Sequence, residues 1–285
     1  MAQEEKIALL TDSTCDLPMS TLNELPIRIL PLKIIYSDQE YRDRFDISPS
    51  EIYGNFDQEI PSTSMPAPQV AKEKLQELKE YGYTHVLAIH ISSGLSGTYN
   101  MVKMIADEIK GLKCTVIDSK SLSIGLGRMI LKASELIEQG VDFEEIVAKI
   151  KDQVEETDLY FVVKTLKYLK KGGRIGKIKG TIGELLNIKP IISINENGEY
   201  YTFKKSRGRK KSINTLYKIA KKQIKQGLSR VNIMHAAAEK EARNLLNKLN
   251  KLENVKDTYL GEIGPGMVVH AGPGLIGVLV SPLEE

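Results

Sequence analysis

The hydrophobic pattern of the first half of the chain alternates between short apolar runs and longer runs with apolar residues at helical spacing. The short runs predict buried strands at Ile7–Thr11, Val86–Ile91 and Cys114–Ile117. The longer runs predict helices at Ala67–Lys79, Tyr99–Ile109, Leu122–Gln139 and Phe143–Glu156. Because strands and helices alternate, we expect a parallel sheet with helices on both faces, which is the doubly wound α/β arrangement.

The pattern changes near Asp158, where predicted strands begin to outnumber predicted helices. Strands are predicted at Leu159–Val163, Pro190–Ile194, Tyr200–Phe203, Val231–His235, Asp257–Ile263 and Leu275–Ser281. Helices are predicted at Arg209–Gln226 and Ala237–Leu252, and a hairpin turn at Asn195–Gly198. We therefore expect an α/β protein of two α/β domains, residues 1–160 and 161–285.

Several segments between these elements have local patterns of their own. Ile27–Tyr36 has a strand pattern, and Ser48–Glu51 predicts a capped helix start with proline at the first helical position. Pro61–Pro66 is a hydroxyl-rich segment between two prolines and predicts a loop. Ile182–Leu186 predicts a helical fragment, whereas Gly264–Gly274 is rich in glycine and proline and predicts a rigid loop.

The turn Ser92–Thr98 is the most informative polar segment, because it joins a predicted strand to a predicted helix. Free N–H groups at a helix N-terminus, with glycines that let the backbone approach, form a site for a carboxylate or a phosphate. Ser93 and Ser96 add uncharged hydroxyl donors, although simple turn and helix-cap chemistry accounts for them equally well. Asp12–Thr14 and Asp118 also follow strands, so these groups are expected to converge at one edge of the sheet.

Composition and charge limit the class of protein. A net charge of +3 over 285 residues indicates no nucleic-acid partner. The two cysteines, Cys15 and Cys114, lack metal or disulfide spacing and are typical of thiols in a reducing cytosol. No apolar stretch approaches the roughly 20 residues that span a bilayer, and no signal peptide is recognised. These features predict a cytoplasmic protein without an integral membrane segment.

Three catalytic or nucleotide-binding motifs can be set aside. The run Gly94–Thr98 lacks the second glycine of a G-x-S-x-G nucleophile elbow. Lys171–Thr181 lacks the Gly-Lys-Ser/Thr ending of a P-loop. Gly272–Gly277 fits G-x-G-x-x-G but has no following strand–helix–strand unit, so dinucleotide binding is not expected. No His, Cys or carboxylate set has metal-ligand spacing, and no cofactor is predicted.

Four other candidates lie outside the turn. Thr63 and Ser64 are read from spacing alone as ordinary loop residues more readily than as ligand contacts. His270 is expected to be presented from the glycine-rich loop, with functional and structural readings evenly balanced. Arg174, between glycines, predicts an exposed loop that could meet an acidic partner or a phosphate. The basic run from Arg209 is interpreted as the solvated face of an amphipathic helix.

Several motifs together resemble those of the DegV family of bacterial fatty-acid-binding proteins over essentially the whole length. They are Thr11–Thr14, Thr63–Pro66, Ile91–Tyr99, Leu169–Ile175, Leu186–Pro190 and His270–Gly274. The resemblance implies two α/β domains with a long-chain fatty acid, of the palmitate or oleate class, in a tunnel between or near them. It also implies the acid-carrying subunit of a fatty acid kinase. A separate kinase subunit would phosphorylate the bound carboxylate to an acyl phosphate for phospholipid synthesis.

The resemblance also implies roles for single residues. Thr63 and Ser93 match hydroxyls that contact the carboxylate, with Ser64, Ser96 and Gly94 beside them, and His270 matches a histidine near the head group. Arg174 matches an arginine at the pocket mouth that meets the kinase subunit. By this reading the chain is a carrier and not itself an enzyme. Two alternatives stay open: an enzyme acting on a phosphorylated metabolite through Ser93, Ser96 and His270, or a lipid-sensing regulatory protein.

Overall fold

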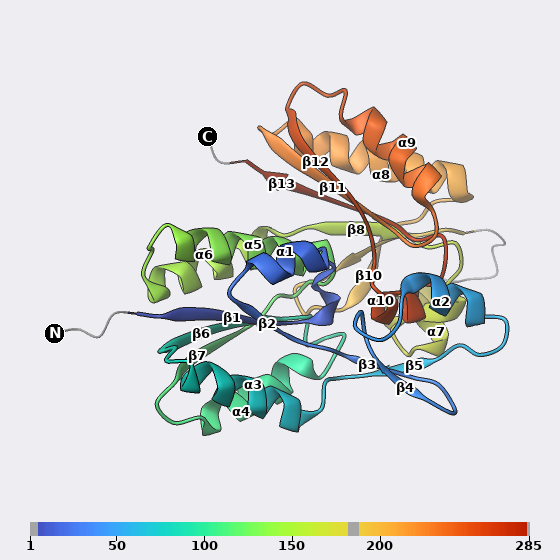
Figure 1. Ribbon diagram of the computed structural model, residues 1–285. Helices are drawn as coiled ribbons and strands as arrows, with labels where there is room; N and C mark the ends of the chain where they lie inside the picture. Colours follow the sequence, from blue (N-terminus) through green and yellow to red (C-terminus); the bar gives the residue numbers. More distant parts are fainter. Residues whose placement is uncertain (1–4, 182–187, 284–285) are drawn as a thin grey trace.

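The computed structural model describes residues 5–181 and 188–283, which form layers of sheets and helices (Figure 1). The predicted helical fragment Ile182–Leu186 and the first two residues of the Leu186–Pro190 motif lie outside the described residues. Within the described ranges, no helix is long and apolar enough to cross a bilayer.

A four-stranded parallel sheet forms the centre of the first half, as the alternating pattern predicts. In sheet order its strands are β2 (Ile27–Leu30), β1 (Ile7–Asp12), β6 (His85–His90) and β7 (Lys113–Asp118). One face is covered by α3 (Pro68–Glu80) and α4 (Thr98–Glu108), the other by α1 (Met19–Glu24), α5 (Ile124–Glu138) and α6 (Phe143–Glu156) (Figure 1). Asp12, His90 and Asp118 therefore lie at the same edge of the sheet.

A six-stranded mixed sheet forms the second half. In sheet order its strands are β10 (Tyr200–Lys204), β9 (Ile191–Ile194), β8 (Leu159–Val162), β13 (Ile276–Pro282), β11 (Ser229–His235) and β12 (Val255–Glu262). The predicted hairpin turn at Asn195–Gly198 is confirmed, since it joins antiparallel β9 and β10. Alternate residues face opposite sides: Tyr160 and Val162 pack under the outer helices, whereas Leu159 and Phe161 pack toward the first half.

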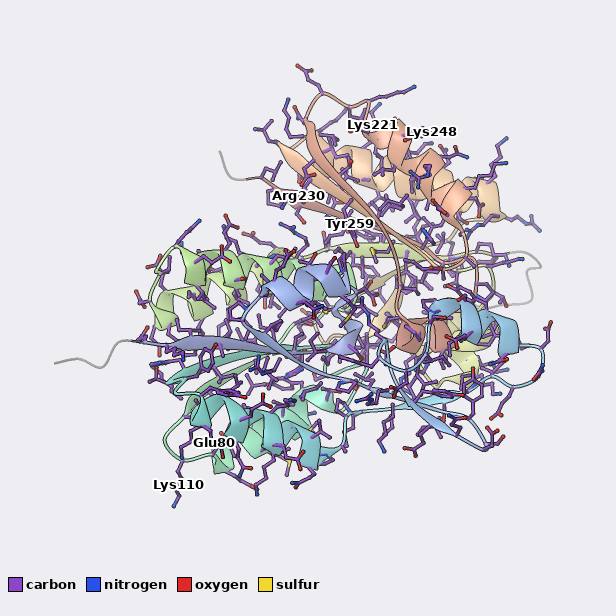
Figure 2. The ribbon with its side chains drawn as sticks, in the orientation of Figure 1. Glu80, Lys110, Lys221, Arg230, Lys248 and Tyr259 are labelled. Carbon is purple, nitrogen blue, oxygen red and sulfur yellow. The ribbon has the colours of Figure 1, made fainter. Side chains whose placement is uncertain are left out.

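Those outer helices are α8 (Arg209–Ile224) and α9 (Glu239–Leu249). Leu216 and Ile224 of α8 are buried against the sheet, and the basic residues of the helix lie around this apolar stripe. Figure 2 shows Lys221 and Lys248 on this outer layer. The interpretation of the basic run as a solvated helix face is therefore confirmed.

A small three-stranded sheet corrects two predictions. Its strands, in order, are β4 (Glu40–Arg42), β3 (Lys33–Ile35) and β5 (Ser62–Ser64). The single strand predicted over Ile27–Tyr36 is wrong, because the chain leaves the parallel sheet at Pro31, which has no N–H for a ladder. The loop predicted over Pro61–Pro66 is also wrong: its centre pairs with β3, with Thr63 opposite the buried Ile34.

Three short helices complete the region. The predicted helix start at Ser48 is confirmed as a capping box on α2 (Pro49–Asn55). Helix α7 (Lys167–Lys171) ends at Gly172 and is followed by the 3₁₀ turn η2 (Gly176–Thr181). The loop predicted over Gly264–Gly274 is wrong in its middle, which forms α10 (Pro265–Ala271). Proline is compatible with the first turn of a helix, so Pro265 begins α10 instead of preventing it.

One hydrophobic core runs through both halves. Leu87 and Phe143 of the first half belong to the same cluster as Phe161, Met234 and Val268 of the second. The predicted boundary between residues 160 and 161 falls inside β8, and the change of sheet occurs just before that strand. The division into two domains remains a prediction.

Candidate functional site

The side chains of Thr63 and His270 meet although they lie 207 residues apart in the sequence. The Thr63 hydroxyl and the Nε2 atom of His270 are 2.7 Å apart. Thr63 is at the centre of β5 and His270 is near the end of α10, and these two elements pack together. The structure thus joins two residues whose predicted proximity rested on family resemblance alone.

The His270 imidazole is held in its neutral form. Burial, together with repulsion from the nearby Arg174 guanidinium, lowers its pKa to about 4. Its Nδ1 atom is buried against Gly172 and has no hydrogen-bond partner among the described residues. A side chain at position 172 would place Cβ 2.1 Å from Nδ1, so glycine is required there.

The surroundings of His270 favour one tautomer. An unpartnered buried N–H is rarer than an unpartnered acceptor, which places the single ring proton on Nε2. The Nε2–H group then donates to the Thr63 oxygen, and the Thr63 hydroxyl hydrogen is directed elsewhere. This arrangement leaves Thr63 as an uncharged donor for a ligand.

Arg174 lies beside the Thr63–His270 pair. Its Nε donates to the carbonyl of Leu95 at 3.2 Å and its Nη1 donates to the carbonyl of Gly172 at 2.8 Å. The side chain is half-buried, so the prediction of an exposed loop arginine is wrong. It places positive charge beside the Thr63–His270 pair and ties η2 and α7 to the turn after β6.

These residues line a narrow pocket of about 30 Å³, which we call the head-group pocket. Its lining comes from both halves of the chain and comprises Thr14, Leu32, Thr63, Ser64, Met65, Ile91, Leu95, Ser96, Leu122, Arg174, Tyr200, Gly266, Met267 and His270. Among the described residues of this lining, the polar side chains are hydroxyls, one imidazole and one guanidinium, without a carboxylate. A pocket with this lining can hold an anionic group.

A second narrow cavity, also of about 30 Å³, adjoins the head-group pocket, and we call it the apolar cavity. It is lined by Leu122, Ser123, Leu159, Phe161, Leu169, Tyr200, Met234, Ile263, Met267, His270, Ala271, Leu275 and Gly277. Four residues line both spaces: Leu122, Tyr200, Met267 and His270. A polar pocket therefore adjoins an apolar cavity, and both spaces are narrow in this structure.

The turn after β6 contributes to the head-group pocket in a different way from that predicted. The N–H of Ser93 donates to Asp118, that of Gly94 to the Ser92 hydroxyl, and those of Leu95 and Ser96 to the Ser92 carbonyl. These four N–H groups are therefore already hydrogen-bonded and are not free for an anion. An anion site at the N-terminus of α4 itself stays a prediction. The turn reaches the pocket through Leu95 and the Ser96 side chain.

The predicted polar residues of this region separate into two groups. Ser96 and Ser64 line the head-group pocket, whereas Ser93 and Gly94 line neither cavity. Gly94 instead packs against the β9–β10 turn, where an added Cβ would lie 2.6 Å from the carbonyl oxygen of Gly198. The Ser92 hydroxyl donates to the same carbonyl at 2.8 Å, so this face of the turn joins the two halves.

Several residues of the site were not predicted from the sequence, among them Tyr200 and Gly266. Tyr200 is buried where the two cavities meet, and burial raises the pKa of its phenol. Its ring packs edge-on against the ring of Phe161, with 5.2 Å between the ring centroids. Gly266 forms part of the pocket wall at the start of α10. A strand pattern does not show which residue of β10 faces a cavity, and the glycine-rich segment was predicted as a loop.

Comparison with known proteins identifies the family. The family model described as "Uncharacterised protein, DegV family" matches residues 6–283. The chain belongs to the DegV family. A DegV domain-containing protein of Clostridium acetobutylicum is 47% identical over 282 residues, which are 99% of this chain and 100% of that protein.

Two solved structures of DegV proteins share this fold. One, described as showing fatty acid binding of a DegV family protein from Thermus thermophilus, has a TM-score of 0.92 at 32% identity and covers 98% of this chain and 100% of its own. The other, described as DegV, a fatty acid binding protein from Bacillus subtilis, has a TM-score of 0.90 at 30% identity and covers 97% and 99%. Both names state that the proteins bind fatty acids.

Proposed function

We propose that this DegV protein binds a long-chain fatty acid, with the carboxylate in the head-group pocket and the acyl chain in the apolar cavity. The observation that carries the proposal is the junction of the two spaces at Tyr200, Met267 and His270. A fatty acid has the same division into one charged end and a long apolar chain. The fatty acids bound by the Thermus and Bacillus relatives support the same ligand class.

The chemistry of each space suits its part of the ligand. Each buried methylene contributes roughly 0.8 kcal/mol, so the chain can supply most of the affinity. At the other end, Thr63 and Ser96 are uncharged hydroxyls, and Arg174 is already bonded to two carbonyls. Neutral donors can hold a carboxylate without pairing it to a cation, which leaves it reactive toward a phosphoryl group.

The chemical step belongs to a partner in this proposal. The protein presents the bound carboxylate to a fatty acid kinase subunit, which phosphorylates it to an acyl phosphate. Phosphoryl transfer requires Mg-ATP machinery, which this proposal assigns to the kinase subunit. The apolar lining supports a carrier over an enzyme for phosphorylated metabolites.

The proposal is tested by removing lipid from the protein and titrating it with oleate and palmitate. We expect one molecule per chain, and Thr63→Ala should weaken oleate binding by about 1–3 kcal/mol, the scale of a lost hydrogen bond to a charged group. Ser96→Ala and Ser93→Ala decide which serine contributes. Thr215→Ala, on the outer surface of α8, is the control. A protein that takes up neither acid would contradict the proposal.

The kinase step is tested on the same loaded protein. With Mg-ATP alone, we expect no oleoyl phosphate, and with an added fatty acid kinase subunit we expect it to form. Arg174→Ala should reduce this transfer more than it reduces oleate binding, if the arginine contacts the kinase. Formation of oleoyl phosphate without a partner would overturn the carrier role but not the binding site.

A further inference from the structure

Two buried aspartates hold the first turn of α10, the helix that carries His270. Asp16 Oδ1 accepts a hydrogen bond from the N–H of Gly264, and Asp43 Oδ1 accepts one from the N–H of Gly266, both at 2.8 Å. Both aspartates are at most 2% exposed. Pro265, between the two glycines, has no N–H to satisfy, so the carboxylates meet the donors at the start of the helix.

The backbone at these positions is shaped to admit the carboxylates. A Cβ at Gly264 would lie 2.9 Å from Asp16 Oδ1, and one at Gly266 would lie 2.8 Å from Asp43 Oδ2. Neither glycine has a positive φ, so close approach is the reason for glycine here. The glycines predicted as loop residues are therefore contact points between the aspartates and α10.

The second oxygen of each aspartate is fixed from the other side. The Ser123 hydroxyl donates to Asp16 Oδ2 at 2.5 Å, and the Ser13 hydroxyl donates to Asp43 Oδ2 at 2.6 Å. Ser13 also accepts the N–H of Leu32 at 3.0 Å. Leu32 lines the head-group pocket and Ser123 lines the apolar cavity. Each aspartate thus links α10 to residues that border the ligand space.

Neither aspartate has a direct ion-pair partner in the described chain, so its role is that of a hydrogen-bond acceptor. Burial raises the pKa of Asp43 to about 7 and that of Asp16 to about 6, while Arg44 opposes the rise. Among other ionisable groups, Asp12, which is hydrogen-bonded to His90, raises the pKa of Asp16, and Asp16 raises that of Asp43.

We propose that Asp16 and Asp43 are positioning residues for the head-group pocket: by fixing the first turn of α10, they set His270 against Thr63. His270 follows Gly266 by four residues, one helical turn later, and α10 has only seven residues. A displacement of its first turn therefore moves the imidazole. The 2.7 Å hydrogen bond between His270 and Thr63 would be lengthened or broken by such a movement. The inference rests on the proposed fatty acid site, since His270 acts there.

The alternative is that the aspartates only stabilise the core. The two roles differ in a double-mutant cycle, because independent effects add in free energy and coupled effects do not. Oleate affinity is measured for wild type, Asp43→Ala, His270→Ala and the double variant, at a temperature where all are folded. If Asp43 acts through His270, its loss matters only while the imidazole is present.

We expect Asp43→Ala to weaken oleate binding by about tenfold in the wild-type background and by less than about twofold in the His270→Ala background. Asp43→Asn, which keeps an acceptor for the Gly266 N–H, should restore most of the affinity. Asp38→Ala, an exposed aspartate between β3 and β4, is the matched control and should leave oleate affinity unchanged. If Asp43→Ala does not fold, Asp16→Ala replaces it in the same cycle.

Equal losses in both backgrounds would overturn the inference while leaving the fatty acid site intact. Failure of Asp43→Asn to restore affinity would also count against it. A wild-type protein that binds no oleate is a different result, because it removes the proposed function itself. Circular dichroism and the thermal midpoint of each variant separate unfolding from a local loss of position.

Discussion

At the scale of single residues, the head-group pocket depends on a histidine kept neutral by its surroundings. Burial and Arg174 both lower the pKa of His270, to about 4. A neutral imidazole can hold the Thr63 hydroxyl in one orientation, whereas an imidazolium would donate from both nitrogens, one of which faces Gly172. Thr63 and His270 together supply a neutral donor, and Arg174 supplies a positive charge beside them.

The lowered pKa of His270 has a consequence for stability. The unfolded chain binds a proton at His270 below about pH 6.5, and the folded protein does so only below about pH 4, so the folded state binds fewer protons between these values. The contribution of His270 to the free energy of unfolding is fully present above about pH 6.5 and is lost as pH falls toward 4. We expect the stability advantage of wild type over His270→Gln to shrink between pH 7.5 and pH 5 in urea titrations.

The difference in stability between wild type and His270→Gln isolates the effect of His270. Asp43 and Asp16 have raised pKa values, so their contribution runs the other way: it is present at low pH and is lost as pH rises toward 6 or 7. Both proteins contain these aspartates, so their effect cancels in the difference. A wild-type advantage that does not change with pH would contradict the account of a neutral, buried His270.

At the scale of elements, the turn after β6 in the first half packs against the β9–β10 turn in the second half. Gly94 lies close to the carbonyl of Gly198, and the Ser92 hydroxyl donates a hydrogen bond to the same carbonyl. The head-group pocket lies on the other side of the first turn, at Leu95 and Ser96. The order of residues in this turn therefore separates a structural face from a ligand-facing side.

A methyl group at Gly94 tests this contact. Gly94→Ala would place Cβ 2.6 Å from the carbonyl oxygen of Gly198, so backbone must move. We expect a loss of about 1–3 kcal/mol in the free energy of unfolding, measured with urea. Gly54→Ala is the matched control: it has open space in α2 and should be neutral or stabilising by up to about 1 kcal/mol. Equal effects of the two changes would rule out the proposed packing role.

The elements also show what could be predicted from the sequence. The parallel sheet, its helices, the β9–β10 hairpin and the capping box at Ser48 follow from local periodicity and turn chemistry. Strand β5 and helix α10 could not be predicted that way. Thr63 is in a strand because Ile34 pairs with it, and α10 is stabilised by two aspartates more than two hundred residues away.

At the scale of the whole molecule, the site exists only where the two halves meet. The apolar cavity takes Leu122 from the first half and Phe161 and Met234 from the second, and the head-group pocket joins Thr63 to His270. Short motifs indicated several of these residues through the family resemblance. Tyr200 has no such signal, because its role comes from its place in the wall shared by the two cavities and not from its neighbours in sequence.

The central claim, a carboxylate beside Thr63 with its chain in the apolar cavity, is tested most directly by a crystal structure with a brominated fatty acid. Anomalous scattering from 9,10-dibromostearate locates the chain without reference to a model of the ligand. We predict bromine peaks within the cavity lined by Phe161 and Met234, and a carboxylate oxygen within about 3.2 Å of the Thr63 hydroxyl. Bromine peaks on the outer surface, with an empty interior, would contradict the account.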